Sequence, residues 1–413
     1  MPIAHYVLID NIDVSPFVMG ADIDVLIPSS NTSYVQQADI TLSNVGGRFD
    51  GAVNVVGETS APFENKKNFQ TDPEVSPLSL IMVILISIEY PGPSVHSALV
   101  FTGLAQKADY GYTTCKISAG TSDLKANAYL KQDIFDHKGK PTRPIIDRIC
   151  EQYGLEEGEI KVPAGMEKRE WGFLRDQSGK GVLDYLAEND GQEVFMDENN
   201  QLQYVPPGVR GINPPYTGRM KYPAQSESAV GLCNRVTVRG ASPADPTHPH
   251  ASNLPDRAMF YETTDADLAM ILNNENGEGG AEVAASMLEN YGRIDAPTFY
   301  YPDCCTELEC RNRALRLLAR YVTFWNRSMP AVVGRSPKLK SKVSYKYPRL
   351  MLNSPGEVQR YVWALGPEMS GFVTRCKTNY SSKAGWVSYI EVAPFVLNEA
   401  NSAQIYADRD LGL

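Results

Sequence analysis

The five histidines are the first residues to test for catalysis, because imidazole is the usual general base near neutral pH. They are His5, His96, His137, His248 and His250. None stands in a pattern such as Gly-x-Ser-x-Gly, which presents a nucleophile to a base. His248-Pro-His250 places two imidazoles in one loop, too few ligands for a metal site by themselves. We therefore expect neither a catalytic histidine nor a bound metal.

The seven cysteines are densest at Cys304-Cys305 and Cys310. A structural zinc site needs four ligands, often in Cys-x2-Cys pairs, and the fourth ligand is missing here. An odd number of cysteines in a chain of this length does not make a disulfide framework, so reduced thiols are expected. Buried thiols near a helix start are the favoured interpretation, and a strained or redox-active pair is the alternative.

Nucleotide and glycoside chemistry also lack a matching pattern. Gly277-Glu-Gly-Gly280 is not a dinucleotide fingerprint, and Ser178-Gly-Lys-Gly181 lacks the leading glycine and the final Ser or Thr of a phosphate loop. Carboxylates at 188–190 and 197–198 could form a glycosidase pair, but they flank a helix end and a hairpin turn. Solvated turn residues are therefore expected there. The sequence predicts no enzyme and no cofactor.

Basic side chains offer another chemistry, the docking of an acidic surface. Lys338, Lys340 and Lys342 alternate with other residues, so on a strand their ammonium groups would share one face. That face is either a solvated surface that protects a sheet edge or a docking surface for another subunit. Four arginines are expected on the exposed side of a helix over 306–325 and have the same two interpretations: Arg311, Arg313, Arg316 and Arg320.

The chain that must position these residues has 413 residues, 39 Lys and Arg against 49 Asp and Glu, and a net charge of −10. Its 43% hydrophobic and 21% charged residues are typical of folded globular domains. The acidic balance argues against a protein that mainly grips nucleic-acid backbones, though not against one that nucleic acid slides past. Residues 1–20 show no secretory signal pattern.

The longest apolar run is Leu80–Ile86, between Pro77 and Pro91. A membrane-spanning helix needs about 20 apolar residues, so the run predicts a buried strand and no stable membrane insertion.

Hydrophobic periodicity divides the chain into β-rich ends and a middle with helices. Strand-like segments joined by turns fill the first 121 residues. Ile146, Ile149 and Tyr153 follow helical spacing, and Gly154 stands where a C-terminal cap belongs. The predicted fold class is mainly β with α+β insertions, with two small antiparallel tube-like β-barrels, an α+β module and a helical insertion. The expected domains are β-barrel I (1–121), the α+β module (122–225), the first strand of β-barrel II (226–240), a helical insertion packing with the α+β module (241–335), the remainder of β-barrel II (336–395) and a C-terminal tail (396–413).

A short internal echo would relate the two β regions. Leu104, Thr113, Cys115 and Lys116 recur with identical spacings as Leu365, Thr374, Cys376 and Lys377. As a true repeat, the echo would imply two related β domains, the second interrupted by the helical insertion. Chance is an equal explanation for four matches.

Several segments, taken in order, resemble one protein family. Arg143–Leu155 and Asp176–Leu186 each read as a helix that ends near glycine, and Gly191–Tyr204 reads as a hairpin with a turn rich in Asp and Asn. Ser286–Arg293 ends a helix in Tyr-Gly-Arg, and Ala38–Asp50 is a strand followed by a Gly-Gly turn. This arrangement resembles the baseplate-hub (tail-tip hub) proteins of tailed phages and contractile injection systems. The long excursion at 52–77 and the absence of Pro-Gly-Asp before Lys342 depart from that pattern.

The resemblance implies a homotrimer whose barrels form a pseudo-sixfold ring. Such a ring joins the tail tube to a spike or tip and lines the delivery channel. The implied partners are the tail tube or distal tail proteins, the spike or tip protein and the tape measure protein. DNA would pass through the channel without specific binding, and an acidic wall would not retain it. The implied location is the tail tip or baseplate of a virion assembled in the host cytoplasm.

Two other functions remain open. A tail-tip protein that binds a receptor or glycan would need exposed aromatic residues in the loops at 52–77 or 241–255, which offer only Phe63 and Phe69. A tail-associated cell-wall hydrolase, the least favoured function, would need a cluster of carboxylates or histidines that the sequence does not supply.

Overall fold

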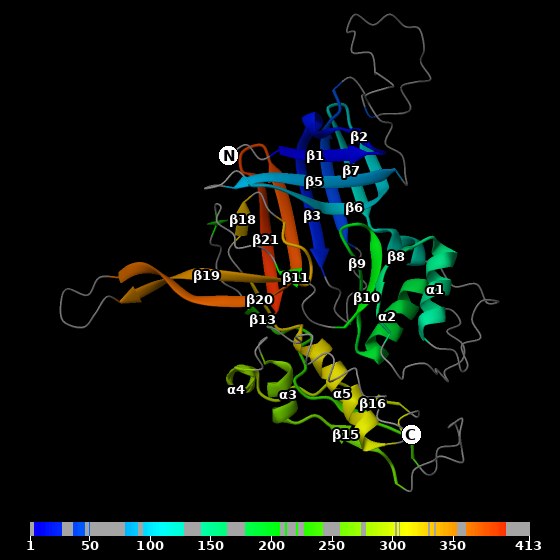
Figure 1. Cartoon of the computed structure of the whole chain (residues 1–413). Helices are drawn as coiled ribbons and strands as arrows, with labels where there is room; N and C mark the ends of the chain where they lie inside the picture. The colour runs from blue at the N-terminus through cyan, green and yellow to red at the C-terminus, as the bar shows by residue number, and fades with distance from the viewer. Residues whose placement is uncertain are drawn as a thin grey trace, which may run out of the picture.

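The computed structural model consists of a large sheet, a small α+β module and a helical module (Figure 1). The predicted fold class, mainly β with α+β insertions, is confirmed. The structure describes residues 4–26, 36–45, 49, 79–89, 94–127, 142–162, 178–206, 211–212, 220–221, 227–242, 257–273, 278–301, 304, 306–328, 331–333, 336–352 and 361–393.

The early strands follow the alternation of their side chains. They are β1 (Ala4–Ile9), β2 (Ile12–Asp13), β3 (Val18–Leu26), β4 (Gln37–Ser43), β5 (Leu80–Glu89), β6 (Ser94–Tyr110) and β7 (Thr114–Gly120). In β4, Ala38, Ile40 and Leu42 are buried, whereas the residues between them are more exposed. This period of two directs one face of the strand into the core. Asp10 and Asn11 have positive φ angles of 49° and 68° in the β1–β2 turn, as a two-residue hairpin turn requires.

The late strands continue the same sheet. They are β17 (Asn326–Ser328), β18 (Ala331–Val333), β19 (Ser341–Leu352), β20 (Tyr361–Ser381) and β21 (Gly385–Ala393), together with the short β11 (Gly211–Ile212), β12 (Met220–Lys221) and β13 (Glu227–Ser228). On one side β20 pairs with β21, and on the other it pairs with β3. The main strand order is therefore β12-β18-β21-β20-β3-β4-β7-β6-β5-β1-β2.

This continuity corrects the expectation of two separate barrels. Among the described strands none close into a barrel, and the two β regions share one sheet because β3 and β20 pair directly. The sheet folds over itself, so that β1 and β5 cross β3 (Figure 1). Val7, Ile81 and Val83 of the crossing strands belong to the same buried core as Ile23 and Ile40.

The internal echo does not join equivalent positions. Leu104 lies on β6 and Cys115 on β7, with a turn between them. Leu365 and Cys376 both lie on β20, which continues as one strand where the first set makes a hairpin. The shared spacing therefore does not mark a structural repeat.

The α+β module contains α1 (Thr142–Tyr153), β8 (Glu156–Ile160), α2 (Gly179–Asp190), β9 (Glu193–Met196) and β10 (Gln201–Val205). The predicted helix around Ile146 and Ile149 is confirmed, since both residues lie buried in the module's own core. The predicted hairpin is confirmed as β9 and β10, which pair antiparallel. Parallel pairing of β8 with β10 was not predicted, because β8 has no alternating pattern of apolar residues.

The helical module contains α3 (Asp265–Ile271), α4 (Gly280–Tyr291) and α5 (Glu307–Val322), with a sheet of β15 (Phe260–Glu262), β14 (Thr237–Arg239) and β16 (Phe299–Tyr300). The predicted capping box is confirmed, since Thr306 and Glu309 bond each other's backbone N–H at the start of α5. The sequence predicts that a strand around 234–240 opens a second barrel. The observed strand there, β14, pairs instead with β15 and β16. Of residues 226–240, only β13 joins the large sheet, through β17.

In Figure 1 the α+β module lies to the right of the lower part of the large sheet, and the helical module lies below. Helix α2 contacts helix α5 where the two modules meet. No helix in the described ranges is both long enough and apolar enough to cross a membrane.

Replacing Asp24 by Asn is expected to weaken the seam between β3 and β20. Arg375 donates two hydrogen bonds to the Asp24 carboxylate, at 2.9 Å from Nε and 2.5 Å from Nη2. The Asp24 side chain is 12% exposed, so we expect the free energy of unfolding to fall by about 1–2 kcal/mol in urea titrations. The control is Asp22→Asn, whose 3.3 Å pair with Lys377 on the same seam is far more exposed and is worth about 0.5 kcal/mol or less. Equal losses would contradict this account of the seam.

Candidate functional site

The three lysines expected on one strand face do not share a face. Strand β19 begins only at Ser341, after Lys338 and Lys340. Lys340 has a positive φ of 61° and is fully buried, which turns the chain inward at this residue. Lys338 is 58% exposed and forms a 2.6 Å ion pair with Glu198, while Lys342 is half-buried on β19. The left-handed backbone at Lys340 breaks the alternation that the prediction assumed.

Lys340 connects the large sheet to the α+β module. Its ammonium group forms an ion pair with the carboxylate of Glu193 on β9, whose side chain is 2% exposed. The same ammonium donates to the carbonyl oxygen of Pro206 at 2.5 Å. The backbone N–H of Lys340 donates to Val373 O on β20 at 2.7 Å. A buried charge is tolerated only when it is paired and hydrogen-bonded in this way.

The arginines of α5 correct the second docking expectation. Arg316 and Arg320 are 6% and 5% exposed, and Arg313 is 7% exposed. Arg313 lies over the ring of Tyr301, with 4.3 Å from its guanidinium carbon to the ring centre, a favourable cation–π geometry. The helix is buried on almost all sides after its first turn, so it has no exposed arginine face there. Only Arg311 of the four remains partly exposed.

Arg316 lies where the helical module meets the α+β module. Gly191, with a φ of 63°, ends α2 against the Cβ and backbone of Arg316. A Cβ at Gly191 would lie 2.7 Å from the Cβ of Arg316, so only glycine fits. We call Gly191, Glu193, Arg316 and Lys340 the module junction. Here the turn between α2 and β9 is held by α5 on one side and by the start of β19 on the other.

Further contacts hold the α+β module to the residue before β4 and to the 3₁₀ turn Ser122–Asn127 that follows β7. The amide of Gln36 donates to Met196 O, and Asn200 Oδ1 accepts from the backbone N–H of Ser122 at 2.8 Å. Lys180 pairs with Asp123 at 2.9 Å, and the two side chains are 7% and 12% exposed. These polar groups are used within the fold, so they position modules rather than a substrate.

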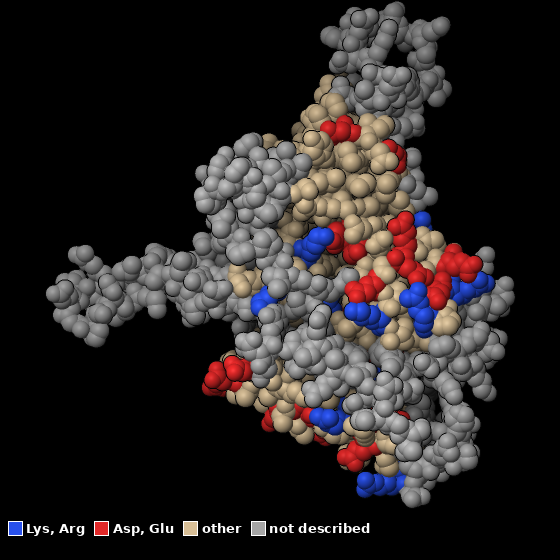
Figure 2. All heavy atoms as spheres, in the orientation of Figure 1, with Lys and Arg blue, Asp and Glu red and all other residues tan. Residues whose placement is uncertain are grey.

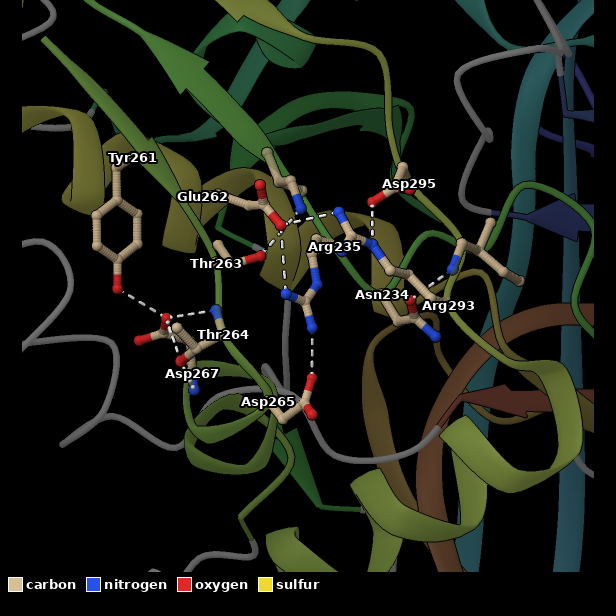
Figure 3. Close-up of polar contacts among 12 residues, drawn as sticks. Asn234, Arg235, Tyr261, Glu262, Thr263, Thr264, Asp265, Asp267, Arg293 and Asp295 are labelled. Carbon is tan, nitrogen blue, oxygen red and sulfur yellow. Dashed lines mark hydrogen bonds and ion pairs between the residues drawn. The ribbon is translucent and has the colours of Figure 1, made fainter.

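A chain of ion pairs covers one side of the helical module (Figure 3). Arg235 bonds Glu262 at 3.3 Å and Asp265 at 2.6 Å, and Arg293 bonds Glu262 and Asp295 at 2.8 Å each. These side chains come from three separate segments, around residues 235, 262–265 and 293–295, which the pairs hold together. Most of the side chains are well exposed, so each pair contributes at most about 1 kcal/mol. This arrangement of exposed ion pairs links segments at the surface and does not resemble a catalytic centre.

Asp267 is the most heavily bonded carboxylate in this module. It accepts from the backbone N–H of Thr264 at 2.8 Å, from the Thr264 hydroxyl at 2.9 Å and from the Tyr261 hydroxyl at 2.8 Å. Burial alone would raise the pKa of Asp267, but these bonds and the charge of Arg311 outweigh it, so the pKa lies below its usual value. The carboxylate thus stays ionised and caps α3.

Two of the carboxylates considered for glycoside chemistry, Asp190 and Asp197, are buried and not solvated, which corrects the expectation for them. Asp190 is fully buried and accepts from the Tyr204 hydroxyl at 2.7 Å. Asp197 is 9% exposed and shapes the β9–β10 turn, accepting from the backbone N–H groups of Asn199 and Gln201 at 2.9 Å each. Burial is the main reason that the pKa of Asp197 is raised.

The thiols fit the interpretation as buried side chains. Cys304 and Cys310 are 2% and 0% exposed and form no disulfide. Gly240 follows β14 and lets the backbone pass close to Cys304 and Cys310. A Cβ at Gly240 would lie 2.3 Å from Cys304 O. Cys305 and the His248-Pro-His250 loop lie outside the described residues. In the part of the chain that is described, no group of three or more His, Cys, Asp or Glu could hold a metal ion.

Comparison with solved structures identifies the fold. The 43 kDa tail protein of prophage MuSo2 from Shewanella oneidensis matches with a TM-score of 0.53 at 11% identity, covering 95% of this chain and 98% of its own. A tail protein from Neisseria meningitidis MC58 matches with a TM-score of 0.53 at 9% identity, covering 95% and 97%. The chain has the fold of these tail proteins. No model of a known protein family matches the sequence, and no curated protein matches it.

Within this tail-protein fold, sequence reasoning missed the module junction. The pattern of lysines was visible, but nothing in it distinguished Lys340 from its neighbours. The glycine at 191 was identified as a helix stop, yet its partner Arg316 lies far along the chain.

Replacing Lys340 by Met is expected to be strongly destabilising, because it leaves the Glu193 carboxylate buried without its cation. Breaking such a pair costs about 3–5 kcal/mol of unfolding free energy, whereas replacing both partners by apolar residues is often neutral. We therefore expect Lys340→Met with Glu193→Met to recover most of the loss in urea unfolding. The control Lys338→Met removes a pair whose lysine is 58% exposed and should cost about 1 kcal/mol or less. A double variant as unstable as the single one would contradict this role.

Replacing Asp267 by Asn is expected to weaken the cap of α3, by about 1–2 kcal/mol at neutral pH. Because the pKa of Asp267 is lowered in the folded chain, its contribution is present above the usual aspartate pKa of about 4 and is lost as the pH falls below it. The difference between wild type and Asp267→Asn should therefore shrink in acid. Unfolding at neutral and acid pH measures it, with the 65% exposed Asp265 changed to Asn as control. A difference that is constant with pH would be inconsistent with this account.

Proposed function

We propose that this chain is a structural protein of a phage-type tail. The observation that carries the proposal is the shared fold over nearly the whole length of two tail proteins, one of them from a prophage, 95% of this chain and 97–98% of theirs. A match over such a span concerns the entire arrangement of sheet and modules, and not one common motif. Fold alone does not fix function. A second, independent support for a structural role is that the buried polar groups are bonded to other groups of this chain.

The finer proposal is a hub at the tail tip or baseplate, assembled as a homotrimer. Its two β regions would both line the ring that joins the tail tube to the spike or tip. Direct pairing of β3 with β20 supports this, since it sets the two β regions side by side in one sheet. The partners would be the tube or distal tail proteins, the spike or tip protein and the tape measure protein.

The proposal does not include an enzymatic role. The candidate carboxylates at 190 and 197 and the lysines at 180 and 340 are bonded to other groups of the chain. With a net charge of −10, a channel wall built from this chain would repel DNA and let it pass without specific binding. Which of these charged residues face the channel depends on how the copies assemble.

The test is to locate the chain in intact particles. A peptide tag on a chain that still assembles into particles, detected with gold-labelled antibody by electron microscopy, should appear at one end of the tail tube. Particles made without the chain should lack a completed tail. Label along the whole tube, on the head, or absent from purified particles would overturn the proposal. An untagged particle preparation is the control for nonspecific labelling.

A further inference from the structure

His5, for which the sequence offers no catalytic partner, is packed inside the fold. It lies on β1 on the same side of the strand as Val7 and Ile9, which are fully buried. Its ring packs against two aromatic rings of the β20–β21 hairpin, at 4.9 Å from the ring centre of Tyr380 and 5.6 Å from that of Trp386. We call His5, Tyr380 and Trp386 the latch, because they join the first strand of the chain to its last hairpin.

The latch stands near one end of the seam between β3 and β20. Tyr380 and Trp386 are direct neighbours across the β20–β21 hairpin, and their ring centres are 5.0 Å apart. On its other side Tyr380 pairs with Ala21 of β3. Among the described strands, β1 pairs only with β2 and β5. Side-chain packing is therefore what holds β1 against the hairpin.

One ring nitrogen of His5 has no hydrogen-bond partner in the described part of the chain. This atom, Nε2, is buried, and the bond that the ring does form is with the backbone of Ser15. Because this bond raises the pKa of His5, the ring is its donor, through Nδ1. In the neutral ring Nε2 is then an acceptor without a donor. Most buried polar side-chain atoms are bonded, so His5 differs from an ordinary core histidine.

Protonation would turn Nε2 into a charged donor at the same buried place. The rings packed against it supply no acceptor on the indole side, because the N–H of Trp386 can only donate and is itself without a partner among the described residues. Burial lowers the pKa of His5, and this effect outweighs the Ser15 bond and the charge of Asp13, which both raise it. The folded chain therefore favours the neutral imidazole.

Few charged groups face the latch from the elements around it. On β2, Asp13 is already bonded to Ser15, whose backbone N–H donates to it at 2.9 Å and whose hydroxyl also donates to it. On β5 the residue opposite His5 is the apolar Leu85. Figure 2 shows a mostly uncharged surface over β1 and β5, while the Lys, Arg, Asp and Glu side chains in this view gather mainly over the two smaller modules. An imidazolium at His5 thus has little compensation beyond Asp13.

We propose that the latch is a pH-sensitive contact, which holds β1 against the β20–β21 hairpin while His5 is neutral and loosens when His5 is protonated. The sign follows from linkage. Because the pKa of His5 is lowered in the folded chain, its contribution is complete above the ordinary histidine pKa of about 6.5 and is lost as the pH falls from there toward the folded pKa. Loosening of β1 would uncover Val7 and Ile9. The inference does not depend on a role in a tail.

The first measurement follows the histidine ring protons of the full chain by NMR between about pH 5 and 8. The His5 signal is the one missing from His5→Gln, and its through-space contacts with the Trp386 ring assign it in wild type as well. It should titrate below the ordinary midpoint of about 6.5. A His5 signal that titrates at or above that value would overturn the proposal.

The second measurement reads β1 directly by amide hydrogen exchange, with protection corrected for the intrinsic effect of pH on exchange. In wild type, protection of Ala4–Ile9 should fall by about fivefold or more from about pH 8 to 5, the factor expected for one uncompensated buried donor. In His5→Gln, whose side chain stays neutral, protection of β1 should change no more than that of β10 (Gln201–Val205), the internal control.

The matched control is His250→Gln, which removes a different histidine and should keep the wild-type response. His5→Phe supplies a second neutral variant, which keeps a ring against Tyr380 and Trp386 if His5→Gln folds poorly. Circular dichroism verifies folding of each variant. A response of β1 to pH that is the same in wild type and in a folded His5 variant would contradict the latch, as would wild-type protection that does not change with pH.

Discussion

Pairing of β3 with β20 is the constraint on which the rest of this structure depends. Seven consecutive residue pairs, from Arg375↔Leu26 to Ser381↔Gly20, join the beginning of the chain to its end. Everything between them, including both smaller modules, is an excursion whose ends meet at this seam. The inward residues of the two strands, such as Ile23 and Cys376, share one core with β5 and β7. Closing so long a loop costs entropy before any contact is formed, so such a topology folds slowly.

The module junction solves a second problem that follows from this topology. Modules inserted into a sheet protein are held only by their ends unless further contacts orient them. Here a buried ion pair and a glycine–arginine contact fix the α2–β9 turn against both the sheet and α5. Apolar packing alone is non-directional, whereas a buried pair is strongly disfavoured in any other arrangement. We interpret the junction as the element that gives the modules one orientation.

The accuracy of sequence-based reasoning varied with the distance between interacting residues. The α5 capping box, the helix around Ile146 and the β9–β10 hairpin were predictable because their signals lie within a few residues of each other. The exposure of Arg316 and Lys340 was predicted wrongly for the opposite reason. Helical and strand periodicity identify the face on which a residue lies, but not what packs against that face. Residues 312–322 of α5 are all buried because two modules enclose the helix.

The amino-acid sequence was sufficient for the fold class, for most individual elements and for the resemblance to tail hub proteins, since each rests on local patterns of apolar, glycine and capping residues. It could not show that the two β regions form one sheet or that β14 belongs to the helical module. Nor could it show that Lys340 forms an ion pair with Glu193. Those features are pairings between residues far apart in the chain. Their free energy comes from excluding water at contacts that exist only after the chain has folded, so no local pattern records them.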